Sequence, residues 1–219
     1  MLIRKIINPR IILTTLFLNA LLVISASSAT TKETVRLASP CKITGQHGVD
    51  RWPAKIDPER VPADKSKITS ITPSQIFAWP GVGVSAHLTK QSSRVASEQR
   101  WFALTGRVVG MKLEADGDIH IELVDANDNK PGIVGAEIPP GQIWCEFRKL
   151  ALSWTTQKFP LSFGSSKSLT VTGNHVVTVT GKAFYDVDHA PKDRSNERGK
   201  PFKPGYAVWE VHPVMGMTR

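Results

Sequence analysis

The sequence predicts a mainly β protein in which five strands and one helix form a small closed barrel. Residues 100–125 read as two strands joined by a tight turn at Asp116-Gly117, and the second strand alternates, so that its apolar face carries Ile119, Ile121 and Leu123. The long first strand contains Gly106 and Gly110, and glycine inside a strand usually marks a bulge where a sheet bends to close on itself. A helical pattern follows the third strand. This order and the bent first strand match the OB-fold, a five-stranded Greek-key barrel; a meandering β-sandwich would not need the helix and is the second choice.

The other elements are predicted from periodicity and turn residues. A short helix is expected at 72–79, because Thr72 can cap it, Pro73 suits its first position and Gln75 completes a capping box. After the opening hairpin, the expected elements are a third strand at 133–138, a helix at 141–155, a short strand at 169–172, and a fourth and a fifth strand at 176–187 and 206–215.

The helix at 141–155 is expected to pack one face on the barrel. Its apolar residues recur at helical spacing and form a single stripe of Ile143, Trp144, Phe147, Leu150, Ala151 and Trp154. Cys145 is predicted on the far side of the helix, away from this stripe, where a crossing segment could reach it.

The chain is expected to divide into a leader at 1–29, an N-terminal arm with the short helix at 30–99, and the barrel domain at 100–219. The arm has scattered proline and charge and little periodicity. Within it, Arg51, Trp52 and Lys55 could hold an anion. A tryptophan in such an arm more often packs the arm onto the domain, and this second interpretation is favoured.

Residues 1–29 have the features of a secretory leader. Three cations precede a largely apolar run at 11–24, and small residues at 27–29 fit a cleavage site. The apolar run is shorter than the roughly 20 residues that span a bilayer, which favours cleavage over a membrane anchor. The mature protein is therefore expected to be exported, periplasmic or secreted, without a transmembrane segment.

The mature chain is basic and carries two cysteines. Removal of the leader leaves 25 Lys and Arg against 19 Asp and Glu, an excess that permits an anionic partner without requiring one. A chain of this length can bury the core of one medium domain. In an oxidising compartment, Cys41 and Cys145 predict one disulfide, with two unrelated thiols as the alternative.

Three polar strings, at 116–122, 186–189 and 209–213, carry the residue types that perform chemistry. The usual ligand surface of an OB-fold is the outer face of strands two and three with the adjoining loops, so we expect the strings near one surface. Imidazoles and carboxylates are ligands for zinc, manganese or non-haem iron. The ligand or metal candidates are Asp118, His120, Glu122, Asp186, Asp188, His189, Glu210 and His212.

These residues leave several interpretations open. A divalent ion, zinc or manganese, could activate water or polarise a phosphoryl oxygen, and a nearby basic loop would suit a polyanionic substrate through Lys192, Arg194, Arg198 and Lys200. Without a metal, one of the histidines could act as an acid or base near neutral pH, paired with Asp118 or Glu210. The structural interpretation, which carries more weight, is that these are solvated residues and turn formers.

Nucleic-acid binding by base stacking is disfavoured. OB-folds that bind single strands present aromatic side chains on the outer face, whereas the second strand presents two carboxylates and a histidine there. The aromatic residues left for such a role are Tyr185, Tyr206 and Trp209, and the last is equally placed to face the core.

The same strings resemble a family of small, exported, uncharacterised bacterial proteins. Its members pair an acidic turn and an Asp-Ile-His strand, here 114–120, with a later Phe-Tyr-Asp-x-Asp-His and a terminal Trp-Glu-x-His-Pro-Val, here 184–189 and 209–214. The Arg51-Trp52-x-x-Lys55 string and the Thr-Pro helix also resemble the family. The resemblance covers most of the mature chain and implies an OB-like fold and export, with no activity attached.

The sequence therefore predicts an exported, monomeric OB-like module that binds an unknown ligand on the face carrying Asp118, His120 and His212. The alternative is a divalent-metal-dependent hydrolase of phosphodiesterase or nuclease type.

Overall fold

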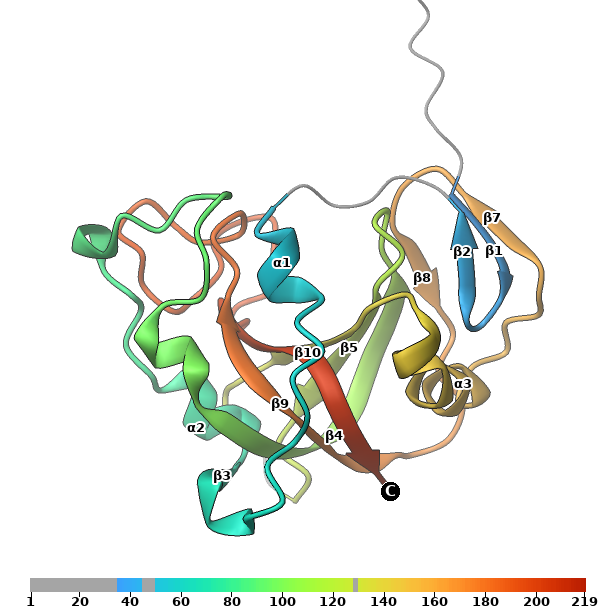
Figure 1. The fold of residues 1–219 in the computed structure, drawn as a ribbon, viewed down its shortest axis with the longest axis horizontal. Coiled ribbons are helices and arrows are strands. Elements are labelled where there is room, and N and C mark those ends of the chain that lie inside the picture. The colour runs from blue at the N-terminus through green and yellow to red at the C-terminus, as the bar shows by residue number, and fades with distance from the viewer. Residues whose placement is uncertain (1–34, 45–49, 128–129) are drawn as a thin grey trace, which may run out of the picture. The chain divides into compact units, whose positions relative to one another are not determined.

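The structure is a computed structural model that describes residues 35–44, 50–127 and 130–219, and Figure 1 shows its fold. The predicted leader at 1–29 lies outside these ranges. The described residues belong to one compact unit. No helix in these ranges is both long enough and apolar enough to span a bilayer.

Five strands form a closed barrel of the predicted OB type. They are β4 (Trp101–Leu113), β5 (Ile119–Val124), β6 (Val134–Ile138), β9 (Val176–Tyr185) and β10 (Trp209–Thr218). Their order in space is β4-β5-β6-β10-β9, and β9 pairs with β4 to close the barrel. The β6–β10 pair is parallel, whereas the other four pairs are antiparallel. Helix α3 (Cys145–Ser153) lies between β6 and β9 in the chain, so the helix predicted between the third and fourth barrel strands is confirmed.

The opening hairpin contains the predicted turn and bulge. Gly117 in the turn has a φ of 95°, a conformation that glycine adopts without steric cost. The pairing of β4 with β5 shifts register between Val108 and Gly110, which marks a β-bulge in the long first strand. The bulge bends β4, which pairs with β5 along one edge and with β9 along the other.

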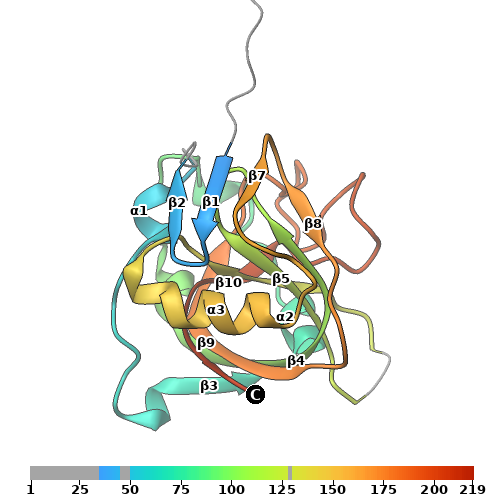
Figure 2. The same cartoon turned by 90° about the vertical axis from the view of Figure 1, so that its right-hand side faces the viewer.

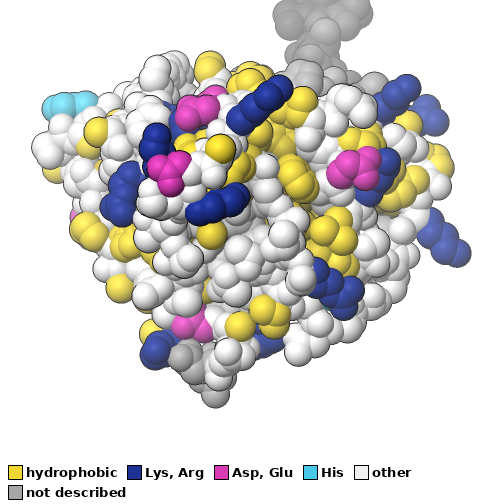
Figure 3. Space-filling view, turned by 60° about the horizontal axis from the view of Figure 1, so that its bottom comes forward, with side chains coloured by type: hydrophobic (Ala, Val, Ile, Leu, Met, Phe, Trp, Pro, Cys, Tyr) yellow, Lys and Arg dark blue, Asp and Glu magenta, His cyan; other side chains and the backbone are white. Residues whose placement is uncertain are grey.

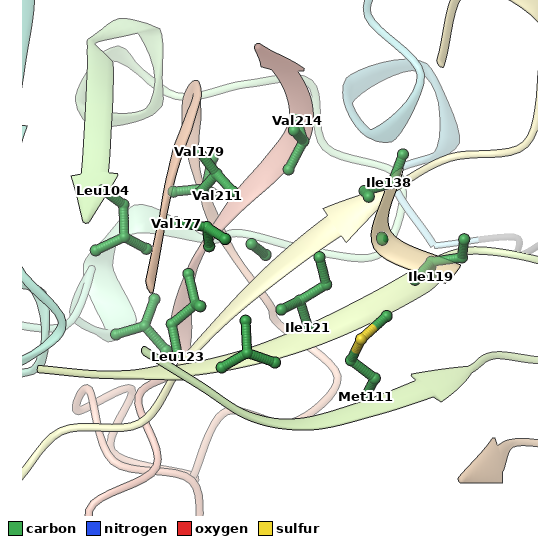
Figure 4. Close-up of a cluster of buried hydrophobic side chains, with 14 of the residues drawn as sticks. Leu104, Met111, Ile119, Ile121, Leu123, Ile138, Val177, Val179, Val211 and Val214 are labelled. Carbon is green, nitrogen blue, oxygen red and sulfur yellow. The ribbon is translucent and has the colours of Figure 1, made fainter. Parts of the chain in front are cut away.

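The interior of the barrel is apolar. Figure 4 shows side chains from all five barrel strands meeting in one cluster, as the alternation in β5 predicts. Burying each aliphatic side chain contributes roughly 1.5–3 kcal/mol, so this cluster is the main stabilising element of the barrel. Its labelled members are Leu104, Met111, Ile119, Ile121, Leu123, Ile138, Val177, Val179, Val211 and Val214.

The helix α3 buries a wider face than the predicted stripe. Ile143, in the 3₁₀ turn η4 (Gln142–Trp144) before the helix, is 56% exposed, so its predicted place in the packed stripe is wrong. Arg148 is fully buried, and its guanidinium donates to the carbonyls of Pro40 and Ile138. Cys145 is reached by the N-terminal segment that carries Cys41, as predicted, and is buried by it.

Five short strands lie outside the barrel, and only a part of one of them was predicted. β1 (Val35–Ser39), β2 (Lys42–Thr44) and β7 (Leu161–Phe163) form a three-stranded sheet, β3 (Ile68–Ile71) pairs in parallel with β4, and β8 (Lys167–Leu169) pairs with β4 near its end. The strand expected at 169–172 corresponds to the end of β8 and an isolated bridge at Val171. Strands of three to five residues are too short for a clear alternation, so the arm and loops appeared irregular.

The predicted disulfide between Cys41 and Cys145 is present. It joins the β1–β2 hairpin to α3, and Figure 2 shows these elements next to each other on one side of the molecule. A disulfide is typical of proteins in an oxidising environment outside the cytoplasm.

The predicted short helix forms as α2 (Pro73–Phe77). The backbone N–H of Thr72 donates to the side-chain oxygen of Gln75 at 2.9 Å, as expected for a capping box. The other helical elements are α1 (Trp52–Lys55) and the 3₁₀ turns η1 (Lys65–Lys67), η2 (Val84–Ala86) and η3 (Ala96–Gln99).

Two arginines fasten the segment around α1 to the outside of the barrel. Arg51 is 1% exposed and donates to the Glu98 carboxylate and, at 3.0 Å, to the carbonyl of Tyr185 in β9. Arg94 donates to the carbonyls of Ala54, of β9 and of β10. In Figure 1 the chain after α1 runs in front of β9 and β10. The polar face of the barrel is therefore largely covered, and the interpretation of its residues as solvated is wrong for His120, Glu210 and His212.

Positively charged side chains are spread over the one face of the molecule that Figure 3 shows. On the face shown in Figure 3, Lys and Arg side chains lie at separate places between hydrophobic patches. This distribution gives no continuous basic stripe on that face.

Candidate functional site

The three polar strings are joined by one chain of charged contacts. In its inner half, His212 of β10 lies between two carboxylates: its Nδ1 is 3.2 Å from Glu210 and its Nε2 is 3.2 Å from Asp118. All three residues are at most 3% exposed. Burial alone would lower the pKa of His212, but the two carboxylates outweigh it and raise the pKa to about 9. His212 is therefore a buried imidazolium at neutral pH.

The outer half of the chain leads from Glu210 to the surface. Arg198 Nη2 is 3.0 Å from Glu210 Oε2 and 3.0 Å from Asp186 Oδ2. The same Asp186 oxygen also binds Nδ1 of His189. Burial alone would raise the pKa of Asp186, but His189 and Arg198 together lower it. The side chain of His189 is 40% exposed. Charges thus alternate from Asp186 at the outer end of the chain, through Arg198, Glu210 and His212, to Asp118 in the interior.

The raised pKa of His212 predicts a pH dependence of stability. A group whose pKa is higher in the folded than in the unfolded protein stabilises the fold below its unfolded pKa, and this stabilisation is lost as pH rises through the folded value. We expect the wild type to lose on the order of 3 kcal/mol from this group between pH 6.5 and 9. Urea unfolding at a series of pH values should show the loss, and H212Q should lack it; an identical pH profile in H212Q would contradict the assignment.

A cavity of about 270 Å³ lies beside this chain. Its wall includes seven carboxylates, which are Asp50, Glu114, Asp116, Glu137, Asp186, Asp188 and Glu210. Four fixed cations also line it, which are Arg51, Lys55, Lys112 and Arg198. Although the whole chain has a net charge of +9, this cavity is acidic.

Three residues of the cavity region form a group that could hold a metal ion. Ligand atoms of Glu114, His120 and Glu137 lie within 4.8 Å of one another. His120 Nδ1 contacts Glu137 Oε1 and is 3.9 Å from Glu114 Oε1, while its Nε2 contacts the hydroxyl of Tyr206. This second contact fixes the orientation of the imidazole ring, as the outer partners of metal-binding histidines commonly do.

One oxygen of this group has no partner. Glu137 is 4% exposed and its Oε2 makes no hydrogen bond within the described chain. A buried carboxylate oxygen without a partner costs stability unless a proton or a cation neutralises it. Burial and the carboxylates of Glu114 and Glu210 raise the pKa of Glu137 well above its usual value, which favours the protonated form of this carboxyl group when no cation is bound.

The pKa values of the two neighbouring groups, His120 and Glu114, are lowered, whereas that of Glu137 is raised. Burial lowers the pKa of His120 to about 4, so that its ring is neutral. Burial would raise the pKa of Glu114, but His120 and Lys112 hold it at about 2. A neutral imidazole and an ionised carboxylate are the forms in which these side chains bind metals.

Gly135 in β6 provides the space in which two of these side chains meet. A Cβ atom at this position would lie 2.9 Å from His120 Cε1 and 3.2 Å from Glu210 Oε2. The charged chain and the metal-binding group are therefore adjacent.

The predicted site residues divide into those at this centre and those outside it. Asp118, His120, Glu210 and His212 lie in the buried network, and Asp186 and His189 lie at its outer end. Glu122 does not line the cavity and lies against Gly110. Asp188 lines the cavity but is exposed and pairs with Lys90.

The predicted basic loop is not a uniform cationic surface. Arg198 is 4% exposed and paired with two carboxylates, and Arg194 donates to the carbonyls of Val187 and Leu88. Only Lys192 and Lys200 of the four are exposed. The aromatic candidates for base stacking, Tyr185, Tyr206 and Trp209, are all buried and form no outer platform.

Sequence reasoning did not identify Glu137 and Glu114 as ligands. Glu137 is the one acidic residue in the otherwise apolar strand 133–138, and a lone carboxylate in a strand buried on both faces is a signal that could have been used. Glu114 belongs to the acidic turn, but its distance from His120 depends on the hairpin geometry.

Comparisons of the chain with models of protein families, with curated proteins and with solved structures find no match.

Proposed function

We propose that this chain is an exported binding module and that its ligand is a divalent metal ion, zinc or manganese, held by Glu114, His120 and Glu137. The observation that carries the proposal is the buried, unpaired Glu137 Oε2 beside the neutral ring of His120. A cation at this point would replace the proton on Glu137 and give its second oxygen a partner.

The charge of the cavity supports a dication. Seven carboxylates face four fixed cations, which leaves three negative charges in excess, or two when Glu137 is protonated. One divalent ion offsets most of this excess, whereas an anionic ligand alone would increase it.

The ligand set suits both metals. Imidazole nitrogen and carboxylate oxygen both bind zinc, and carboxylate oxygens also suit manganese. Three protein ligands leave coordination positions that can take water or a further ligand from the cavity. The disulfide supports the exported location, because it is stable in an oxidising compartment.

The test is metal binding by tag-free protein. Titration calorimetry with Zn²⁺ and with Mn²⁺ should give one site per chain, and E137Q should weaken binding at least 100-fold because it removes the charge while keeping the shape. E122Q is the matched control, since Glu122 lies on the same sheet outside the cavity. It should bind like the wild type.

Two results would reject the proposal. One is the absence of stoichiometric binding of either ion by folded wild-type protein, and the other is equal loss of affinity in E137Q and E122Q.

A further inference from the structure

We propose that the cavity is also a hydrolytic site for small phosphodiesters, in which His189 is the general acid and base. This inference rests on the metal site proposed above and adds a reaction and a catalytic residue to it. It begins from the outer end of the charged chain, which the metal site does not use.

His189 and Asp186 form an oriented pair at the wall of the cavity. Nδ1 of His189 donates to Oδ2 of the Asp186 carboxylate, and Arg198 Nη2 contacts the same oxygen at 3.0 Å. The ring of Phe202 packs edge-on against the imidazole at 4.9 Å between ring centroids. A carboxylate on Nδ1 fixes the tautomer and leaves Nε2 to exchange protons. In the described chain, Nε2 of His189 has no hydrogen-bond partner.

The pair is connected to the metal-binding group through a few short contacts. Arg198 Nη2 touches both Asp186 and Glu210, and Glu210 Oε2 lies with His120 Cε1 around the space above Gly135. His189, Glu114 and Glu137 also line the same cavity. A substrate bound in this cavity can therefore contact both His189 and the metal-binding group.

Lys55 supplies the remaining requirement, a donor for a phosphoryl oxygen. Its side chain lines the cavity, and among the described residues it pairs with Asp116 at 3.4 Å. Burial would lower the pKa of Lys55, but Asp116 and further carboxylates raise it, so the ammonium group stays charged. The other cations of the wall are more closely paired: Lys112 with Glu114 at 2.7 Å, Arg51 with Glu98 at 2.5 Å, and Arg198 with two carboxylates.

The charges favour a diester over a monoester. With a dication present, the wall retains about one negative charge, which repels a phosphate monoester dianion more than a diester monoanion. The volume of about 270 Å³ accommodates the phosphate and one substituent, with the second substituent at the mouth.

The reaction is a hydrolysis that needs no other reactant. A water molecule gives a proton to His189 Nε2, its oxygen forms a bond to phosphorus, and the bond from phosphorus to the leaving oxygen breaks. The leaving oxygen then takes the proton from the imidazolium. The products are a phosphate monoester and an alcohol, and His189 returns to its neutral form.

The experiment uses the mature chain loaded with Zn²⁺ or Mn²⁺, with bis(p-nitrophenyl) phosphate as the diester and p-nitrophenyl phosphate as the monoester. The wild type should hydrolyse the diester faster than the monoester. H189A should lower kcat about 10²–10⁴-fold, with KM and metal content within twofold. Because His189 is 40% exposed, added imidazole should enter the space left in H189A and restore part of the rate, which a structural role would not predict.

H87N is the matched control, because His87 is an exposed histidine that does not line the cavity, and asparagine tolerates its left-handed backbone with a φ of 46°. It should keep the wild-type rate. The inference is overturned if metal-loaded wild type leaves the diester intact, if the monoester is the better substrate, or if H189A retains wild-type kcat. Metal binding without hydrolysis rejects this inference alone, whereas failure to bind metal also rejects the proposed function.

Discussion

Replacing Arg51 by methionine is expected to destabilise the protein by about 3–5 kcal/mol, because it leaves a buried carboxylate without its partner. Arg51 and Glu98 form an ion pair in which both side chains are 0% exposed. The guanidinium also donates to three backbone carbonyls, those of Ser92, Ser93 and Tyr185. Removing it breaks the connection between the segment around α1, the loop before β4 and the end of β9.

The expected loss in the free energy of unfolding is larger for Arg51 than for an arginine at the surface. R60M is the matched control, because Arg60 is exposed and should change the free energy of unfolding by no more than about 0.5 kcal/mol. The double variant R51M/E98M should lose less than the sum of the two single variants, since it removes both buried charges. Urea unfolding at pH 7 measures the wild type, both single variants, the double variant and R60M, and a loss below about 1 kcal/mol in R51M would contradict the structural role.

Removing the disulfide is expected to have a similarly large effect. Cys41 and Cys145 are 104 residues apart, and closing a loop of this length stabilises the folded state by about 4–5 kcal/mol in the chain-entropy model. The double variant C41A/C145A should show this loss in urea unfolding. The bond also holds the β1–β2 hairpin against α3, so the hairpin should lose amide-exchange protection first.

The reduced wild-type protein provides the matching measurement. Dithiothreitol should lower its unfolding free energy by an amount similar to that in C41A/C145A. A small loss in both proteins would mean that packing of the hairpin on α3, rather than the covalent link, secures this part of the fold.

The barrel could be predicted from sequence because its strands are long and its signals are local. The alternation of β5, the glycine at the bulge of β4 and the turn at Gly117 are each visible within a few residues. The capped helix α2 is encoded in the same local way. The strands β1, β3 and β7 are short, and β3 and β7 pair with strands distant in the chain, so no local pattern marks them.

The candidate site was only partly predictable because burial depends on what covers the barrel. Alternation correctly placed His120 on the face opposite Ile121, but the arm and the β9–β10 loop bury that face. The same covering turns Arg198 from a predicted surface cation into the partner of two carboxylates. Glu137 joins the site only through the pairing of β6 with β5, where it lies opposite His120.

The most direct test of the metal centre is a crystal structure of the mature protein grown with Mn²⁺, with diffraction data collected at the manganese absorption edge. We predict a single anomalous peak between Glu114, His120 and Glu137, with His120 Nδ1 and an oxygen of each carboxylate bound to the ion. A map without a peak at this position, in which His120 Nδ1 still contacts Glu137, would contradict the account.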